Sequence, residues 1–332
     1  AGEQTYGEGN WYVRHEARPT DRGLDEYYGY VRGHSASQWS PKNNQRLPED
    51  REKELSYEDG KYYATDVFSD YAVEFIKQAE SKKSPFFLYL AHSSPHFPLE
   101  APAETRDSYL KIYREGWDEL REKRHERQKE MGLITDAWKF TGLSEVPADR
   151  DDIANHYAGK PNPTWKDLPN DRKEDLVYRM ATFAAMIEHV DRGIGRIIAK
   201  LKEQGKLQNT LILFTSDNGA CYEWGPFGFD RSSRQGYTKL HQGEELKKVG
   251  GPGTYHSVGS GWSCLSNTPL RMYKHFNHEG GNCSPLIAHW PDGIQKPDQW
   301  VRSPVHLIDF MPTILEVTDA RYPNTFGGEK IH

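Results

Sequence analysis

The sequence predicts an α/β fold with a mixed, mainly parallel central sheet, because strand-like and helix-like segments alternate along its 332 residues. Three short apolar runs bounded by turn residues indicate strands buried on both faces, at 86–91, 211–215 and 285–290. Apolar residues at helical spacing predict amphipathic helices over 65–79, 183–201 and 305–317. Such alternation is typical of a sheet that carries helices on its faces.

The segments between these elements differ in composition. Residues 104–131 are dominated by Arg, Lys and Glu, which predicts a solvated surface helix or pair of helices. Residues 133–172 are rich in Pro, Asp and Trp and lack a period, which indicates an insertion over the core. Residues 222–262 hold many glycines and few apolar runs, which predicts a mobile surface loop. We therefore expect one domain over residues 1–332, with a helical and loop insertion at 104–172.

Charge and cysteine content bound the possible functions. The net charge of −6 implies no general attraction to nucleic acid or to an anionic membrane. No apolar run approaches the roughly 20 residues of a membrane span. The three cysteines are far apart in the chain and do not define a redox compartment. Since the chain opens on Ala1 rather than methionine, the absence of a visible signal peptide says little about targeting.

The strand predicted at 211–215 runs directly into a polar turn, Ser216-Asp217-Asn218-Gly219. Ligands of open α/β sheets collect beyond the carboxyl ends of such strands. Asp217 and Asn218 offer the oxygen donors that hard divalent cations such as Ca²⁺ prefer, and Gly219 makes a backbone turn easy. On these residues alone, a strand followed by an Asx turn is the commoner interpretation.

Five blocks of sequence resemble the sulfatase family of the alkaline phosphatase superfamily, and within it the bacterial arylsulfatases. They run in the family's order along the chain, at 22–29, 85–99, 191–195, 214–219 and 267–285. The resemblance implies a sulfatase-type α/β sandwich whose small C-terminal subdomain is mostly absent here. It also implies a metal-dependent sulfuric ester hydrolase that acts on a small-molecule or carbohydrate sulfate ester. Most bacterial members are exported, so the expected location is periplasmic or extracellular.

The resemblance assigns roles to four residues. Asp217 and Asn218 would be two ligands of one Ca²⁺ that neutralises the sulfate oxygens. His96 would hydrogen-bond the sulfate group or help to protonate the leaving oxygen, and Lys274 would hold another sulfate oxygen as a compact positive charge. A metal and fixed cationic donors stabilise the charge that develops in sulfate ester cleavage. Without the family, His96 lies between two prolines and could be structural, and Lys274 would be an ordinary surface lysine.

Other histidines and one cysteine are set aside. The spacing of four histidines matches no zinc template, so no metal role is expected for His92, His275, His278 and His289. Cys283 begins a Cys-Ser-Pro sequence that superficially resembles the start of the family's nucleophile motif. The arginine of that motif is missing, and the segment already aligns with the strand that follows Glu-Gly-Gly, so Cys283 is rejected as the nucleophile.

The chain also departs from the family pattern. The motif Cys-x-Pro-x-Arg, whose cysteine is oxidised to formylglycine in most members, is absent, as is the amino-terminal Asp-Asp pair of the metal site. Asp217 and Asn218 cannot alone supply the about six to eight oxygens that Ca²⁺ takes. Near the start, which resembles the interior of the family pattern, Asn10 and Tyr12 stand where the family has a lysine and a histidine that bind sulfate and formylglycine.

From these departures we expect the chain as given to be inactive or nearly so. Two alternatives stay open beside a sulfate ester hydrolase. One is a phosphate monoester or diester hydrolase of the same superfamily, which its nucleophile and number of metal ligands would distinguish. The other is a non-catalytic binding protein for sulfated glycans, which the replacements at Asn10 and Tyr12 favour modestly. Neither the oligomeric state nor the particular ester follows from the sequence.

Overall fold

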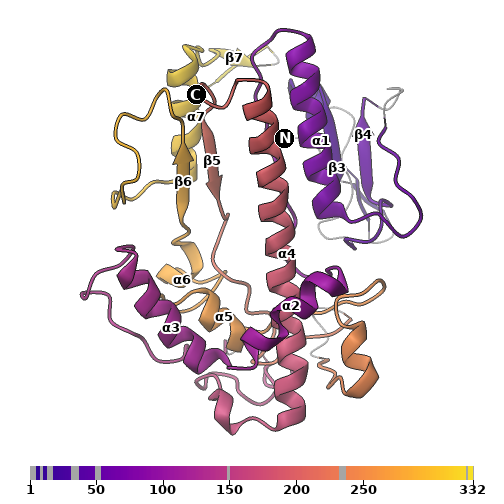
Figure 1. Cartoon of the computed structure of the whole chain (residues 1–332), viewed down its shortest axis with the longest axis vertical. Helices are drawn as coiled ribbons and strands as arrows, with labels where there is room; N and C mark the ends of the chain where they lie inside the picture. Colours follow the sequence, from indigo (N-terminus) through magenta and orange to yellow (C-terminus); the bar gives the residue numbers. More distant parts are fainter. Residues whose placement is uncertain are drawn as a thin grey trace. The chain divides into compact units, whose positions relative to one another are not determined.

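The computed structural model describes residues 5–7, 10–12, 18–30, 37–48, 54–147, 150–231, 237–326 and 328–331. The chain divides into two compact units, Ala1–Gln295 and Lys296–His332. The first unit contains the larger helices and the residues expected to form the site (Figure 1). Among the described residues, no helix has both the length and the apolar composition needed to cross a lipid bilayer.

In the first unit, the described helices are α1 (Ala64–Ser81), α2 (Ala103–Tyr113), α3 (Trp117–Glu130), α4 (Asn170–Glu203), α5 (Ser260–Ser266) and α6 (Glu279–Asn282). Short 3-10 helices cover Pro19–Arg22, Trp165–Asp167 and Gly243–Lys248. The described strands are β1 (Thr5–Gly7), β2 (Asn10–Tyr12), β3 (Tyr27–Tyr30), β4 (Asn44–Leu47), β5 (Ile212–Thr215) and β6 (Leu286–His289). The second unit contains a 3-10 turn Leu307–Asp309, α7 (Phe310–Thr318), β7 (Thr325–Phe326) and β8 (Glu329–Lys330).

The two helices predicted from apolar periodicity at 65–79 and 183–201 are α1 and α4. Both are longer than predicted, and α4 begins 13 residues earlier, directly after Pro169. A proline at this boundary suits a helix start, because its missing N–H would have no partner in the first turn. The two helices pack side by side along much of their length (Figure 1). The helix expected at 305–317 is a 3-10 turn at Leu307–Asp309 that leads into α7.

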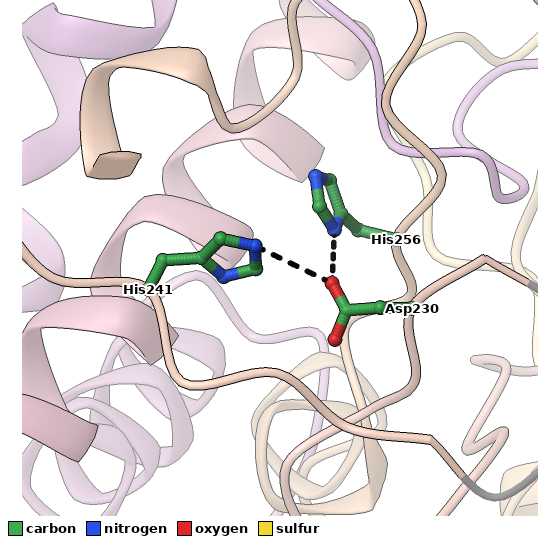
Figure 2. Close-up of side chains that lie close together, drawn as sticks. All are labelled: Asp230, His241 and His256. Atoms are coloured by element: carbon green, nitrogen blue, oxygen red, sulfur yellow. Dashed lines mark hydrogen bonds and ion pairs between the residues drawn. The ribbon is translucent and has the colours of Figure 1, made fainter. Parts of the chain in front are cut away.

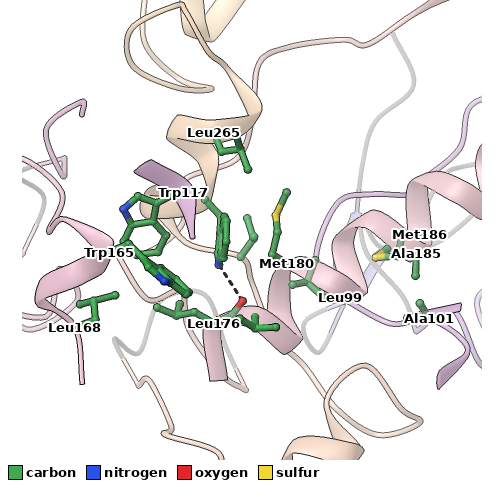
Figure 3. Close-up of a cluster of buried hydrophobic side chains, with 13 residues drawn as sticks. Leu99, Ala101, Trp117, Trp165, Leu168, Leu176, Met180, Ala185, Met186 and Leu265 are labelled. Carbon is green, nitrogen blue, oxygen red and sulfur yellow. Dashed lines mark hydrogen bonds between the residues drawn. The ribbon is translucent and has the colours of Figure 1, made fainter. Parts of the chain in front are cut away.

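The charged run at 104–131 forms the two helices α2 and α3, as expected. Their apolar residues share one core with α4 and α5 (Figure 3). Three tryptophan rings meet in this core. Trp117 meets Trp165 and Trp262 edge-on, with centroids 4.8 and 5.3 Å apart, and Trp165 and Trp262 are tilted at 54° with centroids 5.1 Å apart. Trp117 and Trp165 belong to the region interpreted as an insertion, so that region contributes to the core as well as covering it.

The strands differ from the expected parallel arrangement. Each described pair is antiparallel and two-stranded, and β5 pairs with β6 in the register Ile212↔His289 to Thr215↔Leu286. The apolar run at 86–91 is not part of a strand. Its side chains alternate, because Phe86 and Leu88 pack beside α1 and α4 whereas Phe87 and Tyr89 are 62% and 76% exposed. An apolar run shows that the side chains are apolar but does not show which backbone they lie beside, so the prediction of a buried strand at 86–91 was wrong.

The prediction of a surface loop at 222–262 was wrong. Several side chains of this segment are buried, among them Tyr222, Phe229, Val249 and Val258. Some of its glycines serve close packing. Gly228 has φ +75°, and a Cβ there would come within 3.0 Å of the Ser257 carbonyl carbon. Glycine content was therefore a sign of tight backbone contact rather than of a segment that lies on the surface.

The packing of α1 on α4 yields a prediction with a control in the same helix. A Cβ at Gly193 of α4 would lie 2.9 Å from Cβ of Ser69 on α1 and closer still to its hydroxyl, whereas a Cβ at Gly195 would meet no atom within 4 Å. We expect Gly193→Ala to lower the free energy of unfolding by about 1–3 kcal/mol through overpacking. Gly195→Ala should raise it by up to about 1 kcal/mol through helix propensity. Urea denaturation followed by circular dichroism measures both, and equal effects would contradict this packing.

Candidate active site

The turn after β5 lies directly against the start of α6. The Gly219 N–H donates to the Gly281 carbonyl at 2.9 Å, and a Cβ at Gly219 would collide with the Gly280 carbonyl. Only glycine therefore permits this approach of the two backbones. The two predicted metal ligands, Asp217 and Asn218, sit in this turn, where Asp217 is exposed and Asn218 is half-buried.

One amide side chain ties this turn to the segment that carries the lysine. Asn267 Oδ1 accepts the N–H of Ala220 at 3.0 Å, and its Nδ2 donates to the carbonyls of Met272 and Gly280 at 2.8 Å each. The Lys274 N–H donates in turn to the Ala220 carbonyl at 3.1 Å. The turn after β5 and the distant segment 267–280 are thereby held in a fixed arrangement around the end of β5.

His96 and Lys274 contact each other across 178 residues of sequence. His96 Nδ1 lies 2.8 Å from the Phe97 carbonyl, and its Nε2 lies 3.0 Å from Lys274 Nζ. Because a carbonyl can only accept, Nδ1 carries the proton, and Nε2 presents a lone pair to the ammonium of Lys274. The neutral imidazole and the charged lysine thus orient each other.

The electrostatics of His96 show which other groups are near it. Burial lowers its pKa below the ordinary value, and the positive charge of Lys274 lowers it further. The carboxylates of Glu223 and Asp217 act in the opposite direction and raise it. The structure therefore brings His96, Lys274 and Asp217 into one electrostatic neighbourhood, and Asn218 follows Asp217 in the same turn.

Two residues beside this site were missed by the sequence reasoning. Glu223 is buried, and its Oε1 lies 3.1 Å from Nε2 of His275, whose side chain is 52% exposed. His275 also adopts a left-handed backbone conformation with φ +78°, which is uncommon for a residue other than glycine. The spacing of His275 from the other histidines matches no zinc template, so no metal role was expected for it. Its position directly after Lys274 was the signal that could have identified it.

The cysteines do not provide an activated nucleophile. Burial raises the pKa of the Cys221 thiol to about 12, and burial also raises the pKa of the Cys264 thiol. The pKa of Cys283 is raised as well, by partial burial and by the neighbouring carboxylate of Glu279. Since the thiolate is the reactive form, these shifts lower the reactivity of all three. This agrees with the rejection of Cys283 as the nucleophile.

A second group of polar side chains lies in the segment 222–262. Within the part of the chain that the structure describes, Asp230, His241 and His256 are the residues whose ligand atoms are close enough to hold a metal ion (Figure 2). Two imidazoles and one carboxylate suit a zinc-like ion better than Ca²⁺. The oxygen donors of Asp217 and Asn218 fit Ca²⁺ in kind, but two residues do not fill its coordination shell. The two groups therefore differ in chemistry.

Comparisons with known proteins show which fold and which family this chain has. In solved structures, the chain is similar to Ps i-CgsB, crystallised in complex with k-i-k-neocarrahexaose, with a TM-score of 0.50 and 24% identity over 93% of this chain and 48% of that one. It is 30% identical to an uncharacterized sulfatase of Schizosaccharomyces pombe, over 100% of this chain and 59% of the relative. It is 27% identical to an arylsulfatase of Klebsiella aerogenes, over 95% of this chain and 65% of the relative.

The chain therefore shares its fold with Ps i-CgsB. The family model named Sulfatase matches residues 1–320, and the chain belongs to the sulfatase family. The chain spans about three fifths of the length of the two sequence relatives and about half of the solved structure.

The contact between His96 and Lys274 yields a prediction for the titration of His96. Its pKa should lie below 6.5, rise in Lys274→Met, which removes the nearby positive charge, and fall further in Asp217→Asn. Since the folded-state pKa is lowered, the contribution of His96 to stability is present above pH 6.5 and is lost as the pH falls through the folded-state pKa. NMR titration of the imidazole measures these shifts.

The variant Lys202→Met, at an exposed position on α4, is the control and should leave the His96 titration unchanged. A His96 pKa that does not respond to Lys274→Met would mean that the two side chains are not in contact in solution.

Proposed function

We propose that this chain forms part of the active site of a metal-dependent sulfatase, which cleaves a small-molecule or carbohydrate sulfate ester. The supporting observation is the 3.0 Å contact between His96 Nε2 and Lys274 Nζ, with the Asp217 carboxylate in electrostatic reach of His96. The 27% identity to an arylsulfatase supports an aryl sulfate as the first substrate to test. Export to the periplasm or the exterior is part of the same proposal.

The roles of the residues follow from their charge states. Lys274 donates to a sulfuryl oxygen and stabilises the negative charge there as the ester bond breaks. His96 is neutral with its proton on Nδ1, so its Nε2 accepts from Lys274 and orients that ammonium. A proton for the leaving oxygen then comes from Lys274, or from His96 after it has taken one up at Nε2. Asp217 and Asn218, with further oxygen donors, would hold a Ca²⁺ ion, which would supply positive charge to the sulfuryl oxygens.

We propose that these 332 residues alone do not turn over substrate. Cys-x-Pro-x-Arg is absent from the sequence, and burial and a nearby carboxylate keep the three thiols protonated. The activity tests below therefore use the full-length protein. Binding of a sulfated glycan without turnover is the second candidate, which the missing nucleophile motif favours. An assay with 4-nitrophenyl phosphate beside 4-nitrophenyl sulfate tests the phosphate ester alternative.

The assignment of Asp217 predicts a loss of Ca²⁺ binding. Calorimetric titration of the full-length protein should show one Ca²⁺ site, and Asp217→Ala should abolish both that binding and 4-nitrophenyl sulfate hydrolysis, because the site loses its charged ligand. Asp292→Ala, in the turn after β6, changes the same exposed residue type away from the site and should retain both. Unchanged Ca²⁺ affinity in Asp217→Ala would remove Asp217 from the site.

The assignment of Lys274 predicts a loss of turnover with the fold intact. Lys274→Ala should reduce kcat for 4-nitrophenyl sulfate by about 10²–10³-fold, as expected when one donor to a developing negative charge is removed. Its circular dichroism spectrum and thermal transition should remain close to those of the unchanged protein. Lys202→Ala serves as the matched control. Normal kinetics in Lys274→Ala would show that the lysine segment has been misread.

A further inference from the structure

Asp230, His241 and His256 converge in the interior, apart from the groups around Lys274 (Figure 2). Their relative exposures are 4%, 7% and 4%, and one ligand atom of each lies within 4.8 Å of those of the other two. Nothing in their spacing along the chain suggested the group, since Asp230 is followed 11 and 26 residues later by the two histidines. The fold of the segment 222–262 brings them together.

The hydrogen bonds of His241 fix which of its nitrogens faces the group. Its Nδ1 lies 2.6 Å from Oδ1 of the fully buried Asp175. Because a carboxylate accepts, Nδ1 carries the proton and donates it in this hydrogen bond. The lone pair of Nε2 is then aimed at Oδ1 of Asp230, at 3.6 Å. Two lone pairs face each other there, and no hydrogen bond of ordinary length joins them. A cation between them would turn this repulsion into coordination.

Asp230 and His256 complete the arrangement. His256 Nδ1 donates to the same Oδ1 of Asp230 at 2.5 Å, so in the metal-free protein Nδ1 carries the proton, while Nε2 is buried and has no hydrogen-bond partner among the residues described. The other oxygen of Asp230, Oδ2, accepts from Nη2 of Arg179 at 2.8 Å and from the Lys239 N–H at 2.7 Å. Arg179 therefore holds the carboxylate by one oxygen and leaves Oδ1 directed at both imidazoles.

We propose that Oδ1 of Asp230, Nε2 of His241 and Nδ1 of His256 bind a divalent cation of the zinc class, and that the proton on Nδ1 of His256 moves to its Nε2 when the cation binds. Asp175 acts as the outer carboxylate that orients a metal-binding histidine, a partner that such histidines usually have. Three protein ligands leave one position of a tetrahedral ion open for a water molecule. The site is separate in its ligands from the Ca²⁺ site assigned to Asp217 and Asn218.

Local charge selects the class of metal. The carboxylates of Asp175 and Asp230 are already paired with the guanidinium groups of Arg172 and Arg179. An ion held by charge alone, such as Ca²⁺ or Mg²⁺, therefore gains little attraction here. A zinc-class ion bonds to imidazole nitrogen as well as to oxygen, so it can use Nε2 of His241 directly and can replace the proton on Nδ1 of His256.

The segments that carry Asp230 and His256 contact the loop that carries His96. The carbonyl of His256 accepts the N–H of Leu99 at 3.0 Å, and the rings of Phe97 and Phe229 meet edge-on with centroids 5.0 Å apart. Arg179 donates to the carbonyls of Phe229 and Ser257 at 3.2 and 3.1 Å. A metal at this position would fix the surroundings of the loop that carries His96, which is a structural role.

Metal uptake by the chain itself tests the proposal without any assay of activity. The protein, in a Cys283→Ser background to remove the exposed thiol, is stripped with a chelator, dialysed, and titrated with Zn²⁺ by calorimetry and with Co²⁺ by visible absorption. We expect one site per chain and the intense absorption of tetrahedral Co²⁺. His241→Gln and His256→Gln should abolish both signals, and Asp175→Asn should weaken Zn²⁺ binding about 10–100-fold.

His189→Gln is the matched control. His189 is a buried histidine that also bonds a carboxylate, that of Asp66, but it lies outside the group. This variant should keep the Zn²⁺ affinity. If the glutamine variants fail to fold, the Co²⁺ spectrum of the background protein and the Zn²⁺ affinity of Asp175→Asn still test whether the metal site exists. Absence of Zn²⁺ and Co²⁺ uptake, or equal loss in His189→Gln, would overturn the proposal and leave a purely ionic network.

Discussion

The arrangement around the end of β5 depends on the side-chain amide of Asn267. This amide bonds at once to the turn after β5, to the lysine segment and to a glycine of α6. None of these three segments could find this geometry from its own local preferences, because the turn and the lysine are more than 50 residues apart. Leaving one of the bonded backbone groups without a partner in a buried place costs about 1–3 kcal/mol. The amide therefore specifies the arrangement as well as stabilising it.

Arg179 plays a comparable role in the interior of the first unit. Its side chain is fully buried on α4 and is satisfied by two carboxylates and by backbone carbonyls of the segment 222–262. A buried guanidinium is tolerated only when its charge and donors are matched in this way. Arg179 thus ties the long helix to this segment by polar bonds, beside the apolar contacts that Val258 and Trp262 share with α4 in one core.

Sequence reasoning identified what is encoded locally. The apolar spacing of α1 and α4 is repeated over many turns, so both helices were predicted, although not the early start of α4. The proximity of His96 to Lys274 came only through resemblance to a family, since nothing in either segment refers to the other. Glu223, His275 and the Asp230 group were missed, because their partners are set by tertiary contacts. The glycines of 222–262 were misinterpreted because tight packing and looseness favour the same residue.

The alternation along 86–91 has a consequence for handling the chain. Phe87 and Tyr89 are exposed there, and across the β5–β6 pair the facing residues Phe214 and Ile287 are 47% and 60% exposed. Apolar side chains presented on extended backbone attract one another between molecules and favour edge-to-edge association. Concentrated solutions of these 332 residues would therefore tend toward aggregates, and mild solubilising additives or low protein concentration would be needed to keep molecules apart.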